Sequence, residues 1–169
     1  MLQAIVYESN TGFTKRYAEI LAAQTGIAAY SVAESRKNVA RGSSVVFLSW
    51  ISGGAVVKLD KAKKYFDIRA VGAVGLAAPT AEREAGIVSH HELSIPVFCL
   101  PGGFDMSKLH GMQKIAMSVM IRSFKMQQVT EMRSNDDQML QDMVNGCDHV
   151  SEDAILPLVE WVQIQQTTL

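Results

Sequence analysis

One short polar segment has the composition of an anion-binding loop. Ser9-Asn10-Thr11-Gly12-Phe13-Thr14 follows the first apolar run of the chain and leads into a segment with helical spacing. The first N–H groups of a helix have no acceptor within the helix, and the helix dipole is positive at that end, so both favour a bound anion. The loop contains no lysine, so amides and hydroxyl groups would meet the charge. The alternative is a helix cap without a ligand, because serine and threonine are common caps.

Three other kinds of phosphate-binding loop are disfavoured by the residues present. The dinucleotide fingerprint requires glycines at three fixed positions, and this loop offers Gly12 alone. The nucleoside-triphosphate loop requires a Gly-Lys-Ser/Thr sequence, which this loop lacks. A phosphate-transferring cysteine loop requires a cysteine at this place, whereas the nearest one, Cys99, falls in another apolar run.

The other reactive side chains predict no catalytic residue and no metal ligand. Cys99 and Cys147 lack the paired spacing of a metal site and the density of a disulfide framework. Within its apolar run, Cys99 is expected to be a small buried hydrophobe. His90 and His91 are adjacent and diverge on a helix by about 100 degrees, so we expect a solvated helix end there. No serine can be placed beside a histidine and an aspartate.

Short apolar runs alternate with helix-like segments and predict an α/β fold. Several runs are continuously apolar, as strands covered on both faces should be, and parallel neighbours need helical crossovers. The predicted strands are residues 4–7, 28–32, 45–50, 71–77 and 95–100. The predicted helices are one around residues 17–22 that stops at Gly26, then 58–66, 80–91 with Thr80 as N-cap, 107–127, 136–145 with Gly146 as its stop, and a last one from Ser151 that contains Pro157. A polar break is predicted at 134–137.

The first loop resembles the phosphate-binding signature of flavodoxin-like proteins, S/T-x-T-G-x-T, at every defining position. The resemblance implies a single domain over residues 1–169 with a three-layer α/β/α architecture and a five-stranded parallel sheet in the order 2-1-3-4-5. It also implies flavin mononucleotide (FMN) as the cofactor, bound at the switch point of the sheet. The implied phosphate-binding residues are Ser9, Asn10, Thr11, Gly12 and Thr14, and Phe13, within the same loop, is also among the implied cofactor-binding residues.

In such proteins two further loops hold the flavin ring, and the resemblance implies candidates for both. The first is Trp50-Ile51-Ser52-Gly53-Gly54, and the second is Pro101-Gly102-Gly103-Phe104-Asp105. The loop at 77–80, which contains Pro79, competes with the second. Glycines there would let a backbone amide approach the flavin N5 closely. Trp50 could stack on the ring and Phe104 could cover its edge, or both could be core aromatics.

The last third of the chain, about residues 106–169, is rich in helix signals and methionine. Its methionines are Met106, Met112, Met117, Met120, Met126, Met132, Met139 and Met143. From Ile115 to Ile121 only Ser118 is polar, so this helix should be buried or covered. We expect a helix layer over the sheet. The alternatives are a hydrophobic substrate site, a membrane-surface contact or a homodimer interface.

Residues 101–126 are similar in part to the flavodoxin-like protoporphyrinogen oxidases that pass electrons to menaquinone. This favours an oxidoreductase or electron-transfer protein that acts on a redox partner or on a flat apolar substrate such as a quinone or porphyrinogen. Carrier flavodoxins are strongly acidic, whereas this chain has a net charge of −1 and carries Lys61, Lys63 and Lys64 after its second loop. An ordinary electron shuttle is therefore disfavoured. The alternative is a non-enzymatic module that binds a partner through the Met-rich surface.

Charge and hydropathy also bear on location and partners. A near-neutral chain has no global field that would attract nucleic acid. No stretch reaches the roughly 18 apolar residues of a membrane span, and no basic region precedes the first strand. We therefore expect a cytoplasmic protein with no nucleic-acid partner and no integral membrane segment.

Overall fold

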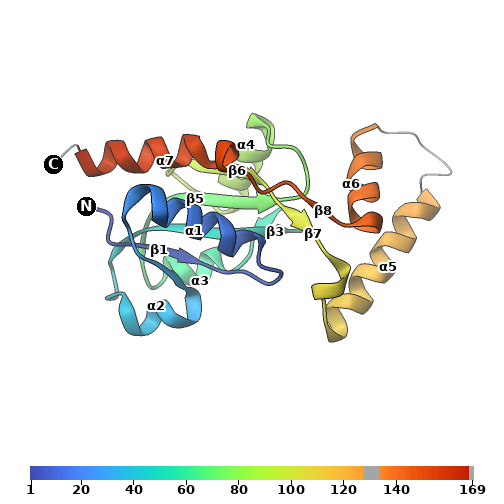
Figure 1. Ribbon diagram of the computed structural model, residues 1–169, viewed down its shortest axis with the longest axis horizontal. Coiled ribbons are helices and arrows are strands. Elements are labelled where there is room, and N and C mark those ends of the chain that lie inside the picture. The colour runs from blue at the N-terminus through green and yellow to red at the C-terminus, as the bar shows by residue number, and fades with distance from the viewer. Residues whose placement is uncertain (128–133, 168–169) are drawn as a thin grey trace.

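The computed structural model describes residues 1–127 and 134–167 and shows a parallel sheet with helices on both faces (Figure 1). The sheet strands are β1 (Ala4–Tyr7), β2 (Ala29–Ser31), β3 (Ser44–Ser52), β5 (Asp67–Gly75) and β6 (Val97–Pro101). They are hydrogen-bonded in the order β2-β1-β3-β5-β6, and every neighbouring pair is parallel. A short strand, β4 (Ala55–Val56), returns antiparallel against the end of β3. The predicted fold class and the order 2-1-3-4-5 are confirmed.

The predicted strands fall on the observed ones, with one clear difference at β5. This strand starts at Asp67, whereas the apolar run suggests a start at 71. Its first residues alternate, with Asp67 and Arg69 exposed and Ile68 buried. A half-covered strand end of this kind lacks the continuous apolar character on which the prediction depended.

Successive residues of β3 face two different cores. Val46 and Leu48 pack against helices α1 (Phe13–Thr25) and α7 (Glu152–Thr167) on one face. Val45 and Phe47 belong to the core of the opposite face. The helices on that face are α2 (Val32–Asn38), α3 (Leu59–Lys63) and α4 (Ala81–His90). The result is a three-layer sandwich, as predicted.

Local signals fix most helix ends. Gly26 ends α1 with a left-handed φ of 73°, and the Thr80 side chain accepts a hydrogen bond from Arg83 N at the start of α4. Helix α2 was not among the predicted helices. Its start is marked by a capping box in which Ser31 and Glu34 bond each other's backbone N–H. Pro157 lies inside α7, which continues through it as one helix.

The Met-rich segment does not form the predicted layer over the sheet. A 3-10 turn η1 (Met106–Lys108) and helices α5 (Gly111–Gln127) and α6 (Ser134–Asn145) extend beyond one end of the sheet (Figure 1). We call residues 105–127 and 134–146 the helical arm. The predicted helix 107–127 is therefore split into η1 and α5, and α6 already begins within the predicted polar break. Met132 lies outside the described residues.

The arm has a small core of its own, which leaves much of α5 uncovered. Buried residues of this cluster are Phe104, Leu109, Ile121, Leu140 and Met143. Since α5 packs mainly on α6, a single stripe of it is covered, and Met112 and Val119 are 79% and 61% exposed. The expectation that α5 is buried or covered is therefore wrong for a single copy of this chain. Among the described residues, no helix is long and apolar enough to span a membrane.

A second, two-stranded sheet fastens the arm to the rest of the fold. Strand β7 (Gly103–Phe104) precedes the arm and β8 (Cys147–Asp148) follows it. The two strands pair antiparallel, with Gly103 opposite Asp148 and Phe104 opposite Cys147. Gly146, with φ of 78°, turns the chain between α6 and β8, as the predicted helix stop requires.

His91 is buried, which corrects the expectation of a solvated helix end. It is 5% exposed, and its Nε2 accepts a hydrogen bond of 2.9 Å from Val56 N in β4. Its Nδ1 therefore carries the hydrogen and donates to Asp60 Oδ1 at 3.1 Å. One imidazole thus joins the end of α4 to both β4 and α3.

Replacing His91 by alanine is expected to lower the free energy of unfolding by about 1–2 kcal/mol, because the buried Val56 N–H loses its acceptor. Urea denaturation followed by tryptophan fluorescence measures the change. The control is His90→Ala, since His90 is exposed and should cost less than about 0.5 kcal/mol. Equal losses in the two variants would contradict this role of His91.

Candidate functional site

The loops that follow the parallel strands gather at one edge of the sheet, because the carboxyl ends of parallel strands lie together. The first loop, residues 8–12, follows β1, and the β3–β4 hairpin follows β3. Residues 101–105 follow β6 and lead into the arm. The strand order reverses at β1, since β2 lies on one side of it and β3 on the other. This reversal is where open α/β sheets bind ligands.

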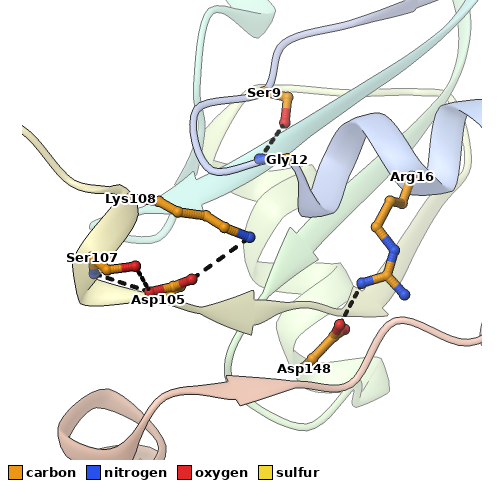
Figure 2. Close-up of polar contacts among 7 residues, drawn as sticks. All are labelled: Ser9, Gly12, Arg16, Asp105, Ser107, Lys108 and Asp148. Carbon is orange, nitrogen blue, oxygen red and sulfur yellow. Dashed lines mark hydrogen bonds and ion pairs between the residues drawn. The ribbon is translucent and has the colours of Figure 1, made fainter.

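The first loop has the backbone geometry of an anion cradle. Gly12 is the N-cap of α1 with φ of 95° and ψ of −15°, and no side chain caps the helix from this position. Ser9 Oγ instead accepts a hydrogen bond from Gly12 N at 3.2 Å (Figure 2). It also accepts one from Lys15 N at 3.3 Å. Its own hydroxyl hydrogen stays able to donate. The amides of Phe13 and Thr14, at the first two helical positions, have no acceptor within the helix.

The loop residues differ in how accessible they are. Asn10 is exposed and Thr11 is half-buried, so both can reach a ligand from solvent. Thr14 is 3% exposed and Phe13 is 7% exposed, so both are packed into the protein. Lys58 Nζ bonds Glu8 Oε1 at 2.7 Å and thereby ties the start of this loop to the segment after β4.

Residues 101–105 lie directly against the first loop. A Cβ added to Gly103 would lie 2.3 Å from Phe13 Cε1 and 2.7 Å from the carbonyl oxygen of Cys147. Gly103 is thus the contact point of α1, β7 and β8. Gly102 N donates a bond of 2.7 Å to Gly75 O, which holds this loop at the end of β5. Phe104 is buried in the arm cluster, so its position favours the core-aromatic alternative.

The β3–β4 hairpin presents a tight turn beside a half-buried tryptophan. Gly53 and Gly54 both have left-handed φ values, 59° and 81°, as the two central residues of a type I′ turn require. Val57 N donates to Trp50 O at 3.0 Å and closes the hairpin. Trp50 is half-buried, so part of its side chain is accessible for stacking. Ser52, Gly53 and Gly54 are exposed, and Ile51 is half-buried.

The loop after β5 is organised by α4. Its Pro79 is exposed, the next residue caps α4, and the Arg83 guanidinium bonds the carbonyl oxygen of Ala78. Leu76, at the start of this loop, packs against the arm cluster. Of the two loops that competed for the ring position, 101–105 is the one that lies against the first loop, through Gly103 and Phe13.

Several charged residues surround the first loop that the sequence did not single out. Lys108 extends from η1 toward the start of α1 (Figure 2). Its Nζ lies 5.1 Å from the centroid of the Phe13 ring. Its carboxylate partner is Asp105, at 3.6 Å. Arg16, on α1, pairs with Asp148 of β8 (Figure 2). The i,i+3 spacing of Asp105 and Lys108 was the one local signal for these pairs.

Hydrogen bonds lower the pKa of two carboxyl groups near the first loop, those of Asp105 and Asp148. The Ser107 hydroxyl and backbone N–H donate to Asp105 at 2.6 and 2.9 Å and lower the pKa of its carboxyl group, with a further contribution from Lys108. Burial by itself would raise the pKa of Asp148, but the hydrogen bonds from Arg16 and from Val150 N outweigh it and lower that pKa. The cations near the loop are thus balanced by anions, and the surroundings are not strongly acidic.

Cys99 behaves as a structural thiol. It is half-buried on β6, its backbone N–H donates to Glu84 Oε1 at 3.1 Å, and burial together with the Glu84 carboxylate raises the pKa of its thiol to about 11. At neutral pH the group is protonated in the folded and the unfolded chain. It therefore offers no nucleophile to the site.

This raised pKa predicts slow and pH-dependent alkylation of Cys99. In Cys147→Ser protein, the rate of reaction with iodoacetamide should keep rising between pH 9 and about 11, because the thiolate forms only there. Mass spectrometry follows the reaction, and circular dichroism checks that the fold persists at each pH. A rate that levels off near pH 9, as it would for a small thiol, would contradict the raised pKa.

Comparisons with known proteins identify no relative: no family model matches the chain, and no curated protein matches it. The fold and the geometry of the site define only a structural class. The protein has a doubly wound α/β sheet in the flavodoxin-like strand order. A polar loop with one glycine lies at its switch point, and a glycine-rich hairpin and a glycine-rich strand end lie at the same edge.

Proposed function

We propose that this protein binds FMN at the carboxyl edge of its sheet and acts as a flavin-dependent oxidoreductase or electron-transfer protein. The observation that carries the proposal is the start of α1. There, a left-handed Gly12 forms the N-cap directly at the strand-order reversal, and the amides of the first two helical positions, Phe13 and Thr14, have no acceptor within the helix. Such a position suits a phosphate group, since the free amides and the helix dipole both favour negative charge.

In this proposal, residues at the carboxyl edge of the sheet are assigned to the two ends of FMN. Ser9, Thr11 and Thr14 with the loop amides would hold the phosphate. Trp50 would stack against the ring system, with the turn at Gly53 and Gly54 beside it. Because glycine has no side chain, the backbone at Gly53 and Gly54 can approach the ring closely.

FMN, when bound, supplies one- or two-electron transfer, and this chemistry belongs to the cofactor. The chain would orient it and exclude water from one side. No acid or base among the side chains is required. Backbone amides of the hairpin would hydrogen-bond the ring and so set its redox potential.

A flat apolar substrate, such as a quinone or porphyrinogen, is the substrate class that we favour. The helical arm leaves residues 101–105 and presents exposed apolar side chains, among them Ile115 at 59% and Val119 at 61% exposure. Methionine adapts to irregular shapes and packs well on flat rings. The near-neutral charge of the chain argues against the docking mode of an acidic carrier.

Flavin uptake tests the proposal. Purified protein mixed with FMN and passed through a desalting column should retain about one equivalent, seen as a yellow protein with quenched flavin fluorescence. Reduction by nicotinamide cofactors and reoxidation by quinones would then be screened. Protein that stays colourless after incubation with excess FMN would refute the proposal.

A second candidate function, a non-enzymatic interaction module, is favoured by the exposed face of α5. Met112, Ile115, Val119 and Met126 are 79%, 59%, 61% and 70% exposed and recur at helical spacing along one stripe. If this stripe joins two copies of the chain, Ile115→Glu combined with Val119→Glu should convert a dimer to a monomer in analytical ultracentrifugation. A monomeric parent protein would exclude the homodimer, and FMN uptake separates this function from the first.

A further inference from the structure

Three metal-binding side chains meet where the arm returns to the sheet. They are the carboxylate of Asp142, the thiol of Cys147 and the imidazole of His149, and one ligand atom from each lies within 4.8 Å of the others. His149 Nε2 and Asp142 Oδ2 are 3.0 Å apart. The cluster lies outside the proposed flavin loops and belongs to α6, β8 and the segment after β8.

The backbone fixes the three positions independently of any metal. Asp142 lies in the last turns of α6, and Gly146, in its left-handed conformation, reverses the chain just after that helix. Side chains two apart on an extended strand point to the same side, which places Cys147 and His149 together. Asp148, between them, points the other way to Arg16 (Figure 2).

Backbone hydrogen bonds hold both β8, which carries Cys147, and the residue after it, His149. Cys147 pairs with Phe104 across β7 and β8, and His149 N donates to Gly102 O at 3.0 Å. A Cβ at Gly146 would lie 3.3 Å from Phe104 O, so the turn is packed closely against β7. The cluster is therefore built on paired backbone and not on a free loop.

From this geometry we propose that Asp142, Cys147 and His149 form a zinc site. Thiolate, imidazole and carboxylate are the ligands that zinc takes in proteins, whereas magnesium and calcium prefer oxygen alone. Tetrahedral zinc with ordinary bond lengths separates its ligand atoms by about 3.3–3.6 Å. The three ligand atoms lie within 4.8 Å of one another, which is close to this range.

The site leaves room for a fourth ligand from solvent. The Asp142 side chain is 12% exposed and that of His149 is 44% exposed, so the carboxylate is sheltered and the imidazole borders water. A water molecule completes the tetrahedron. Binding displaces the thiol proton of Cys147, which passes to solvent, and the zinc–sulfur bond takes its place. The ion would clamp the end of α6 onto β8.

The competing explanation is an ordinary ion pair between His149 and Asp142, which needs no cysteine. Cobalt(II), a spectroscopic substitute for zinc, distinguishes a metal site from such an ion pair. Full-length protein freed of metal by a chelator is titrated with cobalt(II), without added flavin. We expect about one equivalent to bind, with a thiolate-to-cobalt charge-transfer absorption in the near ultraviolet that added zinc abolishes.

Ligand variants and a matched control complete the test. Loss of outer groups around a metal typically costs about 10–100-fold in affinity, so Cys147→Ser and His149→Ala should each weaken cobalt binding at least about 100-fold. Cys99→Ser should leave binding and absorption unchanged, because Cys99 lies on β6. Circular dichroism verifies that each variant is folded.

Two results would overturn the zinc site. The first is that the wild-type protein shows no charge-transfer absorption at millimolar cobalt. The ion pair between His149 and Asp142 would then be the whole explanation of the cluster. The second is that a folded Cys147→Ser or His149→Ala variant binds cobalt(II) with the same affinity as the wild type. Because no flavin is present, neither result depends on the proposed function.

Discussion

Replacing Thr11 and Thr14 together by alanine is expected to lower the affinity for FMN about 100-fold and to leave the affinity for riboflavin unchanged. A hydrogen bond to a charged group contributes about 1.5–3 kcal/mol, so two such bonds to the phosphate amount to about 3 kcal/mol or more. This corresponds to about 100-fold in the dissociation constant. Riboflavin lacks the phosphate and reports on the ring site by itself. Quenching of flavin fluorescence on titration measures both affinities.

The matched control for this pair is Thr11→Ser with Thr14→Ser, which keeps both hydroxyl groups. Thr14 is 3% exposed, so its truncation also removes packing, and the unfolding free energy of each variant must be measured alongside. The serine variant should retain most of the FMN affinity. If alanine and serine variants bind FMN equally, or if both flavins lose affinity to the same degree, the phosphate role of this loop is wrong.

Replacing Gly103 by alanine is expected to lower the free energy of unfolding by about 3 kcal/mol, at the upper end of the usual cost of overpacking. The added Cβ would stand 2.3 Å from Phe13 Cε1 and 2.7 Å from the backbone oxygen of Cys147. The phenyl ring could rotate away, but the carbonyl of β8 cannot move without breaking the β7–β8 pair. Urea denaturation measures the loss, and FMN binding should weaken with it because Phe13 begins α1.

Gly86→Ala is the matched control, since no atom lies within 4 Å of the Cβ position at Gly86. Gly86 lies inside α4, where alanine is the better helix former, so this variant should be more stable by about 0.5–1 kcal/mol. If the two glycine-to-alanine substitutions change the free energy of unfolding in opposite directions, the loss at Gly103 is caused by lack of space and not by the loss of glycine. Gly103→Ala protein as stable as the wild type would mean that β7, β8 and α1 do not meet as described.

The parts of the fold that could be predicted are those encoded by neighbouring residues. Continuous apolar runs at β1, β3 and β6 and the stop at Gly26 indicate buried parallel strands joined by helices. The same residues cannot show which helices the sheet leaves uncovered. The apolar stretch of α5 predicts burial, but its partner is the narrow surface of α6 and not the broad face of the sheet.

In the candidate site, too, only the features encoded by neighbouring residues could be predicted. The first loop was predictable because one continuous segment contains the glycine, the hydroxyl groups and the helix start. The contact of Gly103 with Phe13 was not, because it depends on where the arm leaves the sheet. The same holds for Arg16 with Asp148, which are far apart in sequence. The pairing of Cys147 with His149 follows from strand alternation once β8 is known.

The ladder between β7 and β8 has a consequence for how this chain can vary. Phe104 and Cys147 are neighbours across that ladder, so everything between them leaves and re-enters the domain at one point. Lengthening a loop adds only about 0.6 kcal/mol of closure entropy for each doubling. Insertions, deletions or a wholly different pair of helices could therefore replace the arm while the register of the five parallel strands stays as it is. The surface that the arm presents and the stability of the scaffold would then be free to evolve separately.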